Sequence, residues 1–169
     1  MLTMHPIVPM MLGDGTELPR YANPGDAGLD LCSTEDVKLR PGEWKMVGSG
    51  VRMAIPMGYV GIVVPRSGLG CKGLVLKNTC GIIDAGFRGE VMLPLFNNNP
   101  THVWTISPSS VYYTPMNTDA TIHVHKGDRV AQLLIMPVAQ VVLKSVGSLD
   151  ETDRNTGSFG SSGVRGERL

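Results

Sequence analysis

Glycine and proline interrupt this sequence every few residues, which limits the length of any regular element. The 169 residues include 21 Gly and 12 Pro, the residue types that break helices and mark turns. Between them lie short apolar runs, which are KMVGSGVRMAI, GYVGIVV, GEVMLPLF, ATIHVH and RVAQLLIM. Many short strands bounded by turns predict an all-β sandwich or barrel. The best helical candidate, VAQVVLKSV, is equally consistent with a strand because it is rich in valine and follows Pro137.

The balance of charge restricts the class of ligand. Lys and Arg together number 15, as do Asp and Glu, so the formal net charge is zero. A neutral chain without a basic block is a poor candidate for direct binding of long nucleic acid or of a membrane surface. A single nucleotide, bound by a few local charges, remains compatible with this composition.

Cysteine spacing and the N-terminal sequence indicate a cytoplasmic protein with no membrane association. The three cysteines form no C-x-x-C pair, as expected of reduced thiols in the cytoplasm. The opening MLTMHPIVPMML lacks Lys and Arg, so it does not qualify as a signal peptide, and no run approaches transmembrane length.

Apolar content divides the chain into two expected parts. Strand-like runs continue to about residue 147, and we expect residues 1–147 to form one β-barrel domain. Within it, about 101–119 is a long polar and aromatic insert between two strands. Residues 148–169 are polar and rich in Gly and Ser, which predicts a flexible C-terminal arm.

Several short motifs have the chemistry of a nucleotide site, and each also has a plainer interpretation. PRSG follows a strand-like run, so Arg66 and the next two residues suit a phosphate clamp or a simple turn. In AGLDL, Asp30 lies between two leucines and faces away from them on a strand. It suits a hydrated cation or an ordinary solvent-facing position. In GIIDAGFRGEV, Asp84 precedes Phe87 by three residues, which suits either a water-positioning carboxylate beside a ring or an exposed hairpin.

The segment HVHKGDRVAQLLI contains a predicted strand with one polar residue among apolar ones. Alternation places Arg129 on one face with Ala131, and Gln132 on the opposite face. Gln132 therefore needs a hydrogen-bonding partner, from the protein or from a ligand. His123 and His125 share a strand face at a spacing that some metal sites use, but no third ligand is evident.

The tail RNTGSFGSSG sets one guanidinium and one aromatic ring, Arg154 and Phe159, among Gly and Ser. Such a segment is either a disordered end or a lid that closes over an anionic, planar ligand.

Together, AGLDL, PRSG, GIIDAGFRGEV, GDRVAQ and RNTGSFGSSG closely resemble, in order and spacing, the five motifs of the trimeric dUTPase family. The resemblance runs from about Asp26 to Gly163. It implies a distorted jelly-roll-like β-barrel and a homotrimer with active sites at the subunit interfaces. The implied reaction is hydrolysis of dUTP to dUMP and pyrophosphate with Mg²⁺. That reaction limits uracil in DNA and supplies dUMP for thymidylate synthesis.

The resemblance also implies roles at the base, the sugar and the reacting phosphate. Asp84 would activate the water that attacks the α-phosphate, and Phe87 would pack under the deoxyribose. Asn78 would bind uracil together with Gly81 and Ile83 of the same hairpin.

For the triphosphate, the resemblance implies that Arg66, Ser67, Gly68 and Gln132 hold the phosphates. Asp30 would orient water molecules of a Mg²⁺ whose other ligands are the phosphates.

For the arm, the resemblance implies closure over the active site of a neighbouring subunit. Phe159 would stack on uracil and Arg154 would meet the γ-phosphate. Gly160, Ser161 and Ser162 would complete the contacts.

The sequence departs from the family pattern at three places. Phe87 stands where the family usually has Tyr, so any hydroxyl contact is lost while the ring is kept. Asn155 and Ser158 replace two usual glycines of the fifth motif. The insert at about 101–119 has no counterpart in the short form of the family.

Two alternatives remain open. A dCTP deaminase would share the fold and a PRSG-like motif but would lack the RNTGSFGSSG tail. A regulatory role would use the insert, where Trp104, Tyr112 and Tyr113 are typical anchors for a protein partner. An insert here resembles those of some phage-encoded members, which would act in the host cytoplasm.

Overall fold

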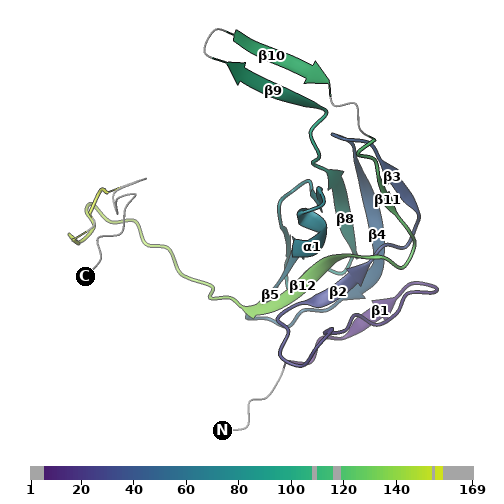
Figure 1. Cartoon of the computed structure of the whole chain (residues 1–169). Coiled ribbons are helices and arrows are strands. Elements are labelled where there is room, and N and C mark those ends of the chain that lie inside the picture. Colours follow the sequence, from purple (N-terminus) through teal and green to yellow (C-terminus); the bar gives the residue numbers. More distant parts are fainter. Residues whose placement is uncertain (1–5, 108–109, 116–118, 154, 158–169) are drawn as a thin grey trace. The chain divides into compact units, whose positions relative to one another are not determined.

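The computed structural model describes residues 6–107, 110–115, 119–153 and 155–157, and nearly all of its regular structure is β-strand (Figure 1). Its strands are β1 (Met10–Leu12), β2 (Leu29–Cys32), β3 (Val37–Leu39), β4 (Trp44–Met53), β5 (Tyr59–Pro65), β6 (Leu74–Leu76), β7 (Gly81–Ile83), β8 (Glu90–Asn97), β9 (His102–Ser107), β10 (Ser110–Pro115), β11 (Ile122–Val124) and β12 (Arg129–Pro137). Each apolar run expected to be a strand forms one, so the all-β prediction is confirmed.

Helix is nearly absent from the residues that the structure describes. It is confined there to α1 (Ser67–Gly70), a single turn of four residues. Nowhere in these residues is there a helix with the length and apolarity needed to cross a membrane.

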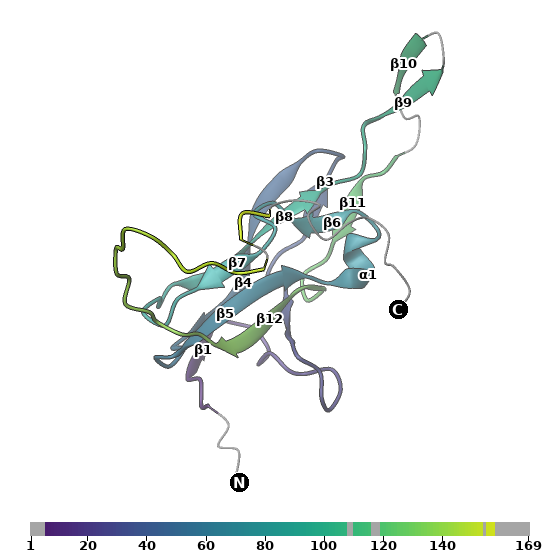
Figure 2. The same ribbon diagram turned by 90° about the vertical axis from the view of Figure 1, so that its left-hand side faces the viewer.

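Antiparallel pairing organises most strands into two four-stranded sheets, in the orders β1-β4-β8-β6 and β2-β12-β5-β7. A turned view shows β12 alongside β5, with α1 directly after the end of β5 (Figure 2). The order β2-β12-β5 brings three sequence motifs together. It places AGLDL, GDRVAQ and the start of PRSG on neighbouring strands of one sheet.

One hydrophobic core fixes these sheets. Its largest fully buried side chains include Leu31 and Leu133 from one sheet and Leu93 and Leu95 from the other. Alternate residues of a strand point to opposite faces, so the intervening residues are left for solvent or for a site. Full burial of such a side chain contributes about 1.5–3 kcal/mol. The strand ends that carry the motifs are therefore set on a packed scaffold.

A β-bulge changes the face on which Arg129 lies. Arg129 pairs with Cys32, whereas Gln132 pairs with Asp30. The register shifts between these two pairs, so that β12 has one extra residue there. This residue is Val130, and it is buried. A bulge of this kind reverses the alternation beyond it. The prediction that Arg129 and Gln132 face opposite sides is therefore wrong, since Arg129 shares the face of Asp30 and Gln132.

The insert forms a hairpin of its own. Strand β9 pairs antiparallel with β10, from Ser107 opposite Ser110 to His102 opposite Pro115.

Asn97 fixes the two chain segments that flank this hairpin. Its buried Nδ2 donates hydrogen bonds to the carbonyl oxygens of Leu39, at 2.9 Å, and Ala120, at 2.8 Å. The end of β8 is thereby tied both to β3 and to the segment that precedes β11.

The chain separates into two compact units, Met1–Ala139 and Gln140–Leu169, and the predicted arm lies within the second. The run VAQVVLKSV, which spans the division, forms neither helix nor strand. In the second unit, Asn155 has a φ of 39°. Asn tolerates this left-handed region better than most residues.

Candidate active site

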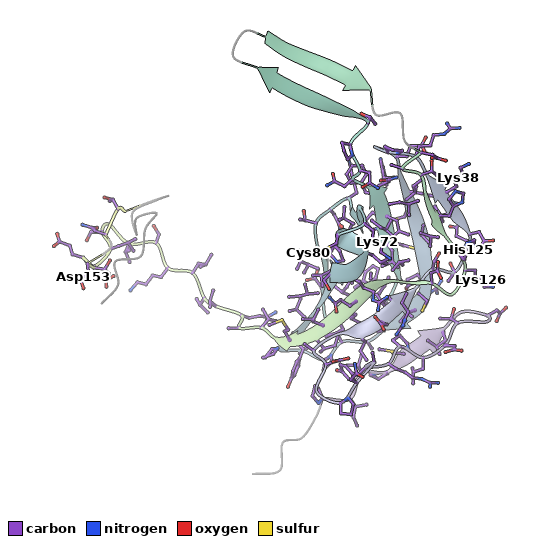
Figure 3. The ribbon with its side chains drawn as sticks, in the orientation of Figure 1. Lys38, Lys72, Cys80, His125, Lys126 and Asp153 are labelled. Atoms are coloured by element: carbon purple, nitrogen blue, oxygen red, sulfur yellow. The ribbon has the colours of Figure 1, made fainter. Side chains whose placement is uncertain are left out.

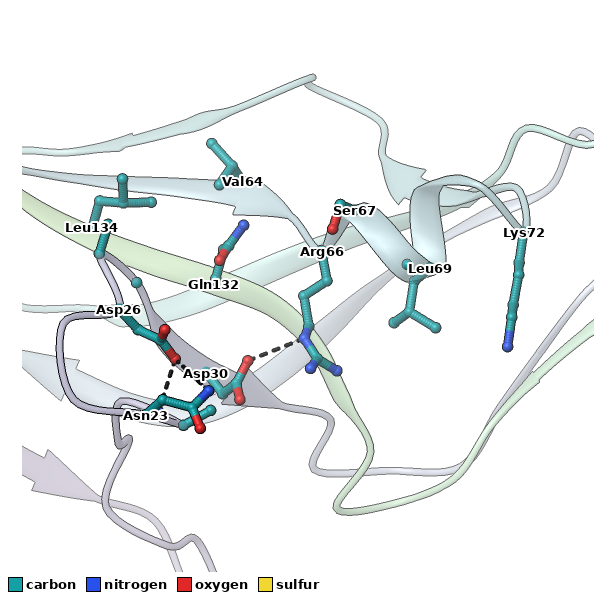
Figure 4. A pocket seen from close by; sticks show the side chains of 14 residues that line it. Asn23, Asp26, Asp30, Val64, Arg66, Ser67, Leu69, Lys72, Gln132 and Leu134 are labelled. Carbon is teal, nitrogen blue, oxygen red and sulfur yellow. Dashed lines mark hydrogen bonds and ion pairs between the residues drawn. The ribbon is translucent and has the colours of Figure 1, made fainter.

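A cavity of about 710 Å³ lies where β2, β5 and β12 meet α1. Charged and polar side chains converge in it (Figure 4). Its lining includes Asp26, Asp30, Arg66, Ser67, Gly68, Lys72 and Gln132. Five of these, Asp30, Arg66, Ser67, Gly68 and Gln132, are residues that the sequence predicted for the phosphate and metal end of a nucleotide site. The fold therefore brings together three motifs that are far apart in the sequence.

Two arginines hold the carboxylate of Asp30. Its Oδ1 lies 3.1 Å from Nε of Arg66, and its Oδ2 lies 3.1 Å from a guanidinium nitrogen of Arg129. Arg66 also donates a hydrogen bond of 2.9 Å to the carbonyl oxygen of Arg129. Only 16% of the Asp30 side chain is exposed, and charge-assisted contacts of this kind are the strong ones. The Arg66 guanidinium is therefore fixed in direction at the cavity wall.

The PRSG motif is a strand end that passes directly into a helical turn. Strand β5 ends at Pro65, and Arg66 is extended, with φ −80° and ψ 132°. Its carbonyl oxygen accepts from the backbone N–H groups of Leu69, at 3.1 Å, and Gly70, at 2.9 Å. This turn presents Ser67 and Gly68 to the cavity.

Gln132 lies against a glycine. Its Nε2 donates to the carbonyl oxygen of Pro65 at 3.3 Å, which answers the need for a partner inferred from the sequence. A β-carbon on Gly28 would stand only 2.9 Å from Oε1 of Gln132. Because Gly28 has no side chain, the amide of Gln132 has room beside it.

Sequence reasoning missed three charged residues at or beside the cavity. Arg129 was misplaced because a bulge is not visible in an alternating pattern. Lys72, labelled in Figure 3 and Figure 4, reaches the lining after a single helical turn that no periodicity reveals. Asp26 accepts hydrogen bonds from the backbone and side chain of Asn23; the PGDAG turn around it was the available indication.

The predicted base and sugar residues lie on a different part of the same chain. Asn78 occupies the turn between β6 and β7, and Gly81 and Ile83 are the ends of β7. Asp84 and Phe87 follow in the loop to β8, and both are exposed. Among the residues described, none of these five lines the 710 Å³ cavity.

The loop between β7 and β8 is closed by its own contacts. The backbone N–H of Phe87 donates to the carbonyl oxygen of Asp84 at 3.0 Å. The guanidinium of Arg88 donates to the carbonyl oxygens of Ala85, at 2.6 Å, and Phe87, at 2.7 Å. The side chain of Asp84 is therefore exposed to solvent on a turn that these hydrogen bonds hold closed.

The predicted arm contacts at Arg154, Phe159, Gly160, Ser161 and Ser162 lie outside the described residues.

A magnesium ion fits this cavity only if other molecules supply most of its ligands. No group of three or more His, Cys, Asp or Glu side chains able to hold a metal occurs in the described ranges. Both oxygens of Asp30 already face arginines. Mg²⁺ commonly keeps several waters and binds substrate phosphates, so the residues present suit a phosphate-held ion with Asp30 beside its water shell.

The two histidines of HVH lie elsewhere, on β11 and just after it. His123 pairs with Lys38 across to β3, and Nδ1 of His125 lies 3.8 Å from Oδ1 of Asp36. Figure 3 labels Lys38, His125 and Lys126 in this region.

Cys32, at the end of β2, is held as a neutral thiol. Burial, followed by the negative charge of Asp30, raises the pKa of Cys32 above its ordinary value. A thiol with a raised pKa is a weak nucleophile at neutral pH.

Comparison with known proteins gives one consistent result. The dUTPase family model matches residues 14–163. The chain is 45% identical over 164 residues to the deoxyuridine 5'-triphosphate nucleotidohydrolase of Nocardia farcinica, covering 96% of this chain and 88% of the relative. It is also 45% identical over 158 residues to the enzyme of that name from Mycobacterium tuberculosis, covering 90% and 91%.

Solved structures agree with these relatives. The dUTPase of Staphylococcus bacteriophage 80alpha with dUpNHpp superposes with a TM-score of 0.78 at 30% identity, covering 94% of this chain and 99% of that one. A mutant dUTPase from phage phi11 of S. aureus, described with a structural Mg(II) ion, gives a TM-score of 0.69 at 29% identity, covering 85% and 98%.

Proposed function

We propose a mechanism on the premise that this chain belongs to the dUTPase family and is a dUTP diphosphatase with that family's jelly-roll-type β fold. The observation that carries the mechanism is the convergence of Asp30, Arg66 and Gln132 on one cavity. This cavity binds the triphosphate of dUTP. The β6–β7 hairpin and the side chain of Phe87, which follows it, bind the nucleoside.

Phosphate binding rests on the cationic side of the cavity. Arg66, Ser67 and Gly68 offer a guanidinium, a hydroxyl and backbone N–H groups at one strand end, and Gln132 adds an amide. Asp30 keeps Arg66 in place by the 3.1 Å contact to its Nε. When bound, Mg²⁺ would neutralise charge on the phosphate oxygens, and Asp30 is the residue that would hold its water shell.

Asp84 acts as the general base in this proposal. Its carboxylate takes a proton from a water molecule while the water oxygen forms a bond to the α-phosphorus. The bond from that phosphorus to the bridging oxygen breaks, and pyrophosphate leaves with the electron pair, giving dUMP. A reaction of this kind needs an aligned nucleophile and charge neutralisation rather than a covalent intermediate.

The nucleoside contacts follow from the same loop. Phe87, three residues after Asp84, packs under the deoxyribose, where its bulk disfavours a 2′-OH. Asn78 binds uracil together with the backbone at Gly81 and Ile83. Support for this assignment comes from the continuity of the hairpin and the loop, since one short segment bears the base, sugar and water contacts.

Separation of the two groups within one chain favours an active site shared between subunits. In the proposed homotrimer, the cavity of one subunit faces the loop of Asp84 from the next. The arm, residues 148–169, closes over the site of a neighbouring subunit with Arg154 on the γ-phosphate and Phe159 on uracil. Gly160, Ser161 and Ser162 complete this contact.

The product dUMP supplies thymidylate synthesis, and removal of dUTP limits uracil in DNA. We place the enzyme in the cytoplasm, or in the host cytoplasm if it is phage-encoded. The free thiols of Cys32, Cys71 and Cys80 support a reducing compartment.

A nucleotide panel tests the reaction. Purified enzyme is incubated with dUTP, dCTP, UTP or dTTP, with Mg²⁺ or with excess chelator, and dUMP and pyrophosphate are quantified. We expect equimolar dUMP and pyrophosphate from dUTP alone, and strong loss of the rate in chelator. Conversion of dCTP to dUTP with release of ammonia would instead identify a deaminase.

Subunit mixing tests the shared site. Chains ending at Asp153 and full-length Asp84→Asn chains are each expected to be nearly inactive. Their mixture is expected to regain partial activity, because arm and base then come from different chains. No recovery, once mass spectrometry has verified mixed trimers, would contradict the shared site.

We propose a second function, binding of a protein partner, for the insert at 101–119. The supporting observation is that β9 and β10 pair with each other as a separate two-stranded sheet. Replacing residues 102–117 by a short Gly linker is expected to leave dUTP hydrolysis unchanged. An unchanged melting temperature would favour a partner-binding hairpin, and a clear decrease would favour a hairpin that serves the stability of its own fold.

A further inference from the structure

The ring of Phe87 occupies the space that a side chain at position 89 would fill. An ideal β-carbon built on Gly89 would lie 2.6 Å from Cζ of Phe87 and 2.9 Å from its Cε2. Both distances are far shorter than ordinary contacts between carbon atoms, which begin at about 3.5 Å. The ring therefore rests directly on the backbone at Gly89.

Backbone conformation does not explain why position 89 is glycine. Gly89 is not among the glycines with positive φ, which include Gly50 and Gly73. Alanine is therefore compatible with the backbone angles at this position. The contact with the Phe87 ring is what leaves no room for it.

The backbone on both sides of Gly89 is restrained. Before it, Arg88 donates hydrogen bonds to the carbonyl oxygens of Ala85 and Phe87 and so closes the loop. After it, Glu90 begins β8, and its Oε1 accepts a hydrogen bond of 2.8 Å from the backbone N–H of Gly50. A new β-carbon at position 89 would therefore displace the ring rather than the chain.

The Phe87 side chain cannot be oriented by a hydrogen bond of its own. Phenylalanine lacks the hydroxyl with which a tyrosine could form an orienting hydrogen bond. The side chain is 40% exposed, so solvent offers it room to move. Packing on the backbone at Gly89 is thus a contact that limits where the ring can lie.

We propose that Gly89 is a specificity-determining residue, because it seats the Phe87 ring that distinguishes deoxyribose from ribose. The inference rests on the proposed packing of Phe87 under the sugar. Gly89 touches neither the sugar nor the reacting atoms and acts only through the ring. With the ring displaced, the wall against a 2′-OH is no longer fixed, and UTP gains access relative to dUTP.

The test compares Gly89→Ala with a matched control in the same loop, Gly86→Ala. Gly86 also has no positive φ, and a β-carbon there meets nothing within 4 Å. For each variant, kcat/KM is measured for dUTP and UTP on one preparation. The ratio of the two values does not depend on the fraction of protein that is folded.

We expect Gly86→Ala to keep the wild-type ratio of dUTP to UTP. Gly89→Ala should lower that ratio about tenfold or more, the size of effect that a change of one carbon in a binding site produces. Phe87→Ala should lower it as well, and the double variant Phe87→Ala/Gly89→Ala should match Phe87→Ala, because without the ring the new β-carbon has nothing to displace.

Each contrary result has a distinct meaning. If Phe87→Ala lowers the ratio and Gly89→Ala does not, the role of Gly89 is refuted while that of Phe87 stands. If Phe87→Ala keeps the wild-type ratio, the sugar contact itself is wrong, and the inference falls with it. An equal effect of Gly86→Ala, or a double variant worse than Phe87→Ala, would show an action other than seating the ring and would also overturn it.

Discussion

The Nε atom of Arg66 lies 3.1 Å from Oδ1 of Asp30, and this ion pair joins the PRSG motif to the AGLDL motif. Arg66 follows β5 and Asp30 is on β2, with β12 between the two strands. The pair therefore depends on correct assembly of the sheet. It also sets the direction of the guanidinium that we assign to the substrate phosphates.

Replacing Asp30 by Asn should impair the enzyme more than the fold. An amide cannot neutralise the guanidinium groups of Arg66 and Arg129, and it is a poorer partner for a hydrated cation. Loss of such a supporting contact commonly costs about 10–100-fold in activity, and we expect kcat/KM for dUTP to fall by that amount. The matched control is Glu35→Gln, which removes an exposed ion pair with Lys45 and should leave kcat/KM unchanged. Equal values for both variants would contradict the role of Asp30.

Gly28→Ala should weaken nucleotide binding through Gln132. The added β-carbon would stand 2.9 Å from Oε1 of Gln132, so the amide must turn away from the cavity. Loss of a hydrogen bond to a charged phosphate raises KM about tenfold, and the melting temperature should stay near that of the wild type. Gly70→Ala is the control, because its β-carbon would meet Val75 at an ordinary 4.0 Å. A wild-type KM for Gly28→Ala would show that Gln132 does not bind substrate.

Asn97→Ala should destabilise the fold without changing the chemistry. It would leave the carbonyl oxygens of Leu39 and Ala120 without their present donor. A buried group left unsatisfied costs about 1–3 kcal/mol, which urea unfolding can measure. Asn98→Ala, at an exposed neighbour, should have little effect. If both variants unfold at the same urea concentration as wild type, Asn97 does not fix the base of the hairpin.

The strands, and the sheet face on which a motif residue lies, could be predicted where the alternation of apolar residues determines them. On β2, Leu31 must enter the core, so Asp30 must face the other side, as the structure has it. The same argument failed for Arg129, because the bulge at Val130 depends on the partner strand and leaves no mark on the local sequence.

Other features of the site lay beyond sequence reasoning because they depend on tertiary contacts. A single helical turn brings Lys72 to the cavity, and one turn is too short to show periodicity. The packing of Phe87 on Gly89 depends on the direction in which the ring of Phe87 points. Separation of Asp84 from the cavity within one chain became visible only with the fold.

Cys32 should be the slowest of the three cysteines to react with iodoacetamide at mildly alkaline pH. Burial and the charge of Asp30 raise its pKa, whereas Cys71 and Cys80 are exposed. Because the folded state disfavours the thiolate, stability from this group is complete at low pH and is lost as the pH rises through the alkaline range. Mass spectrometry of the alkylated peptides gives the three rates, and unfolded protein should show them nearly equal. Faster labelling of Cys32 than of Cys71 in the folded protein would contradict this order.

Asp84→Asn tests the proposed mechanism most directly, since the change removes a base and almost no volume. Single-turnover pyrophosphate release from dUTP is measured beside the affinity for a non-hydrolysable dUTP analogue. Loss of a well-placed general base slows a reaction by about 10²–10⁴-fold, so we expect a fall of that size with nearly unchanged analogue affinity. Wild-type-like release by Asp84→Asn would contradict the proposed mechanism.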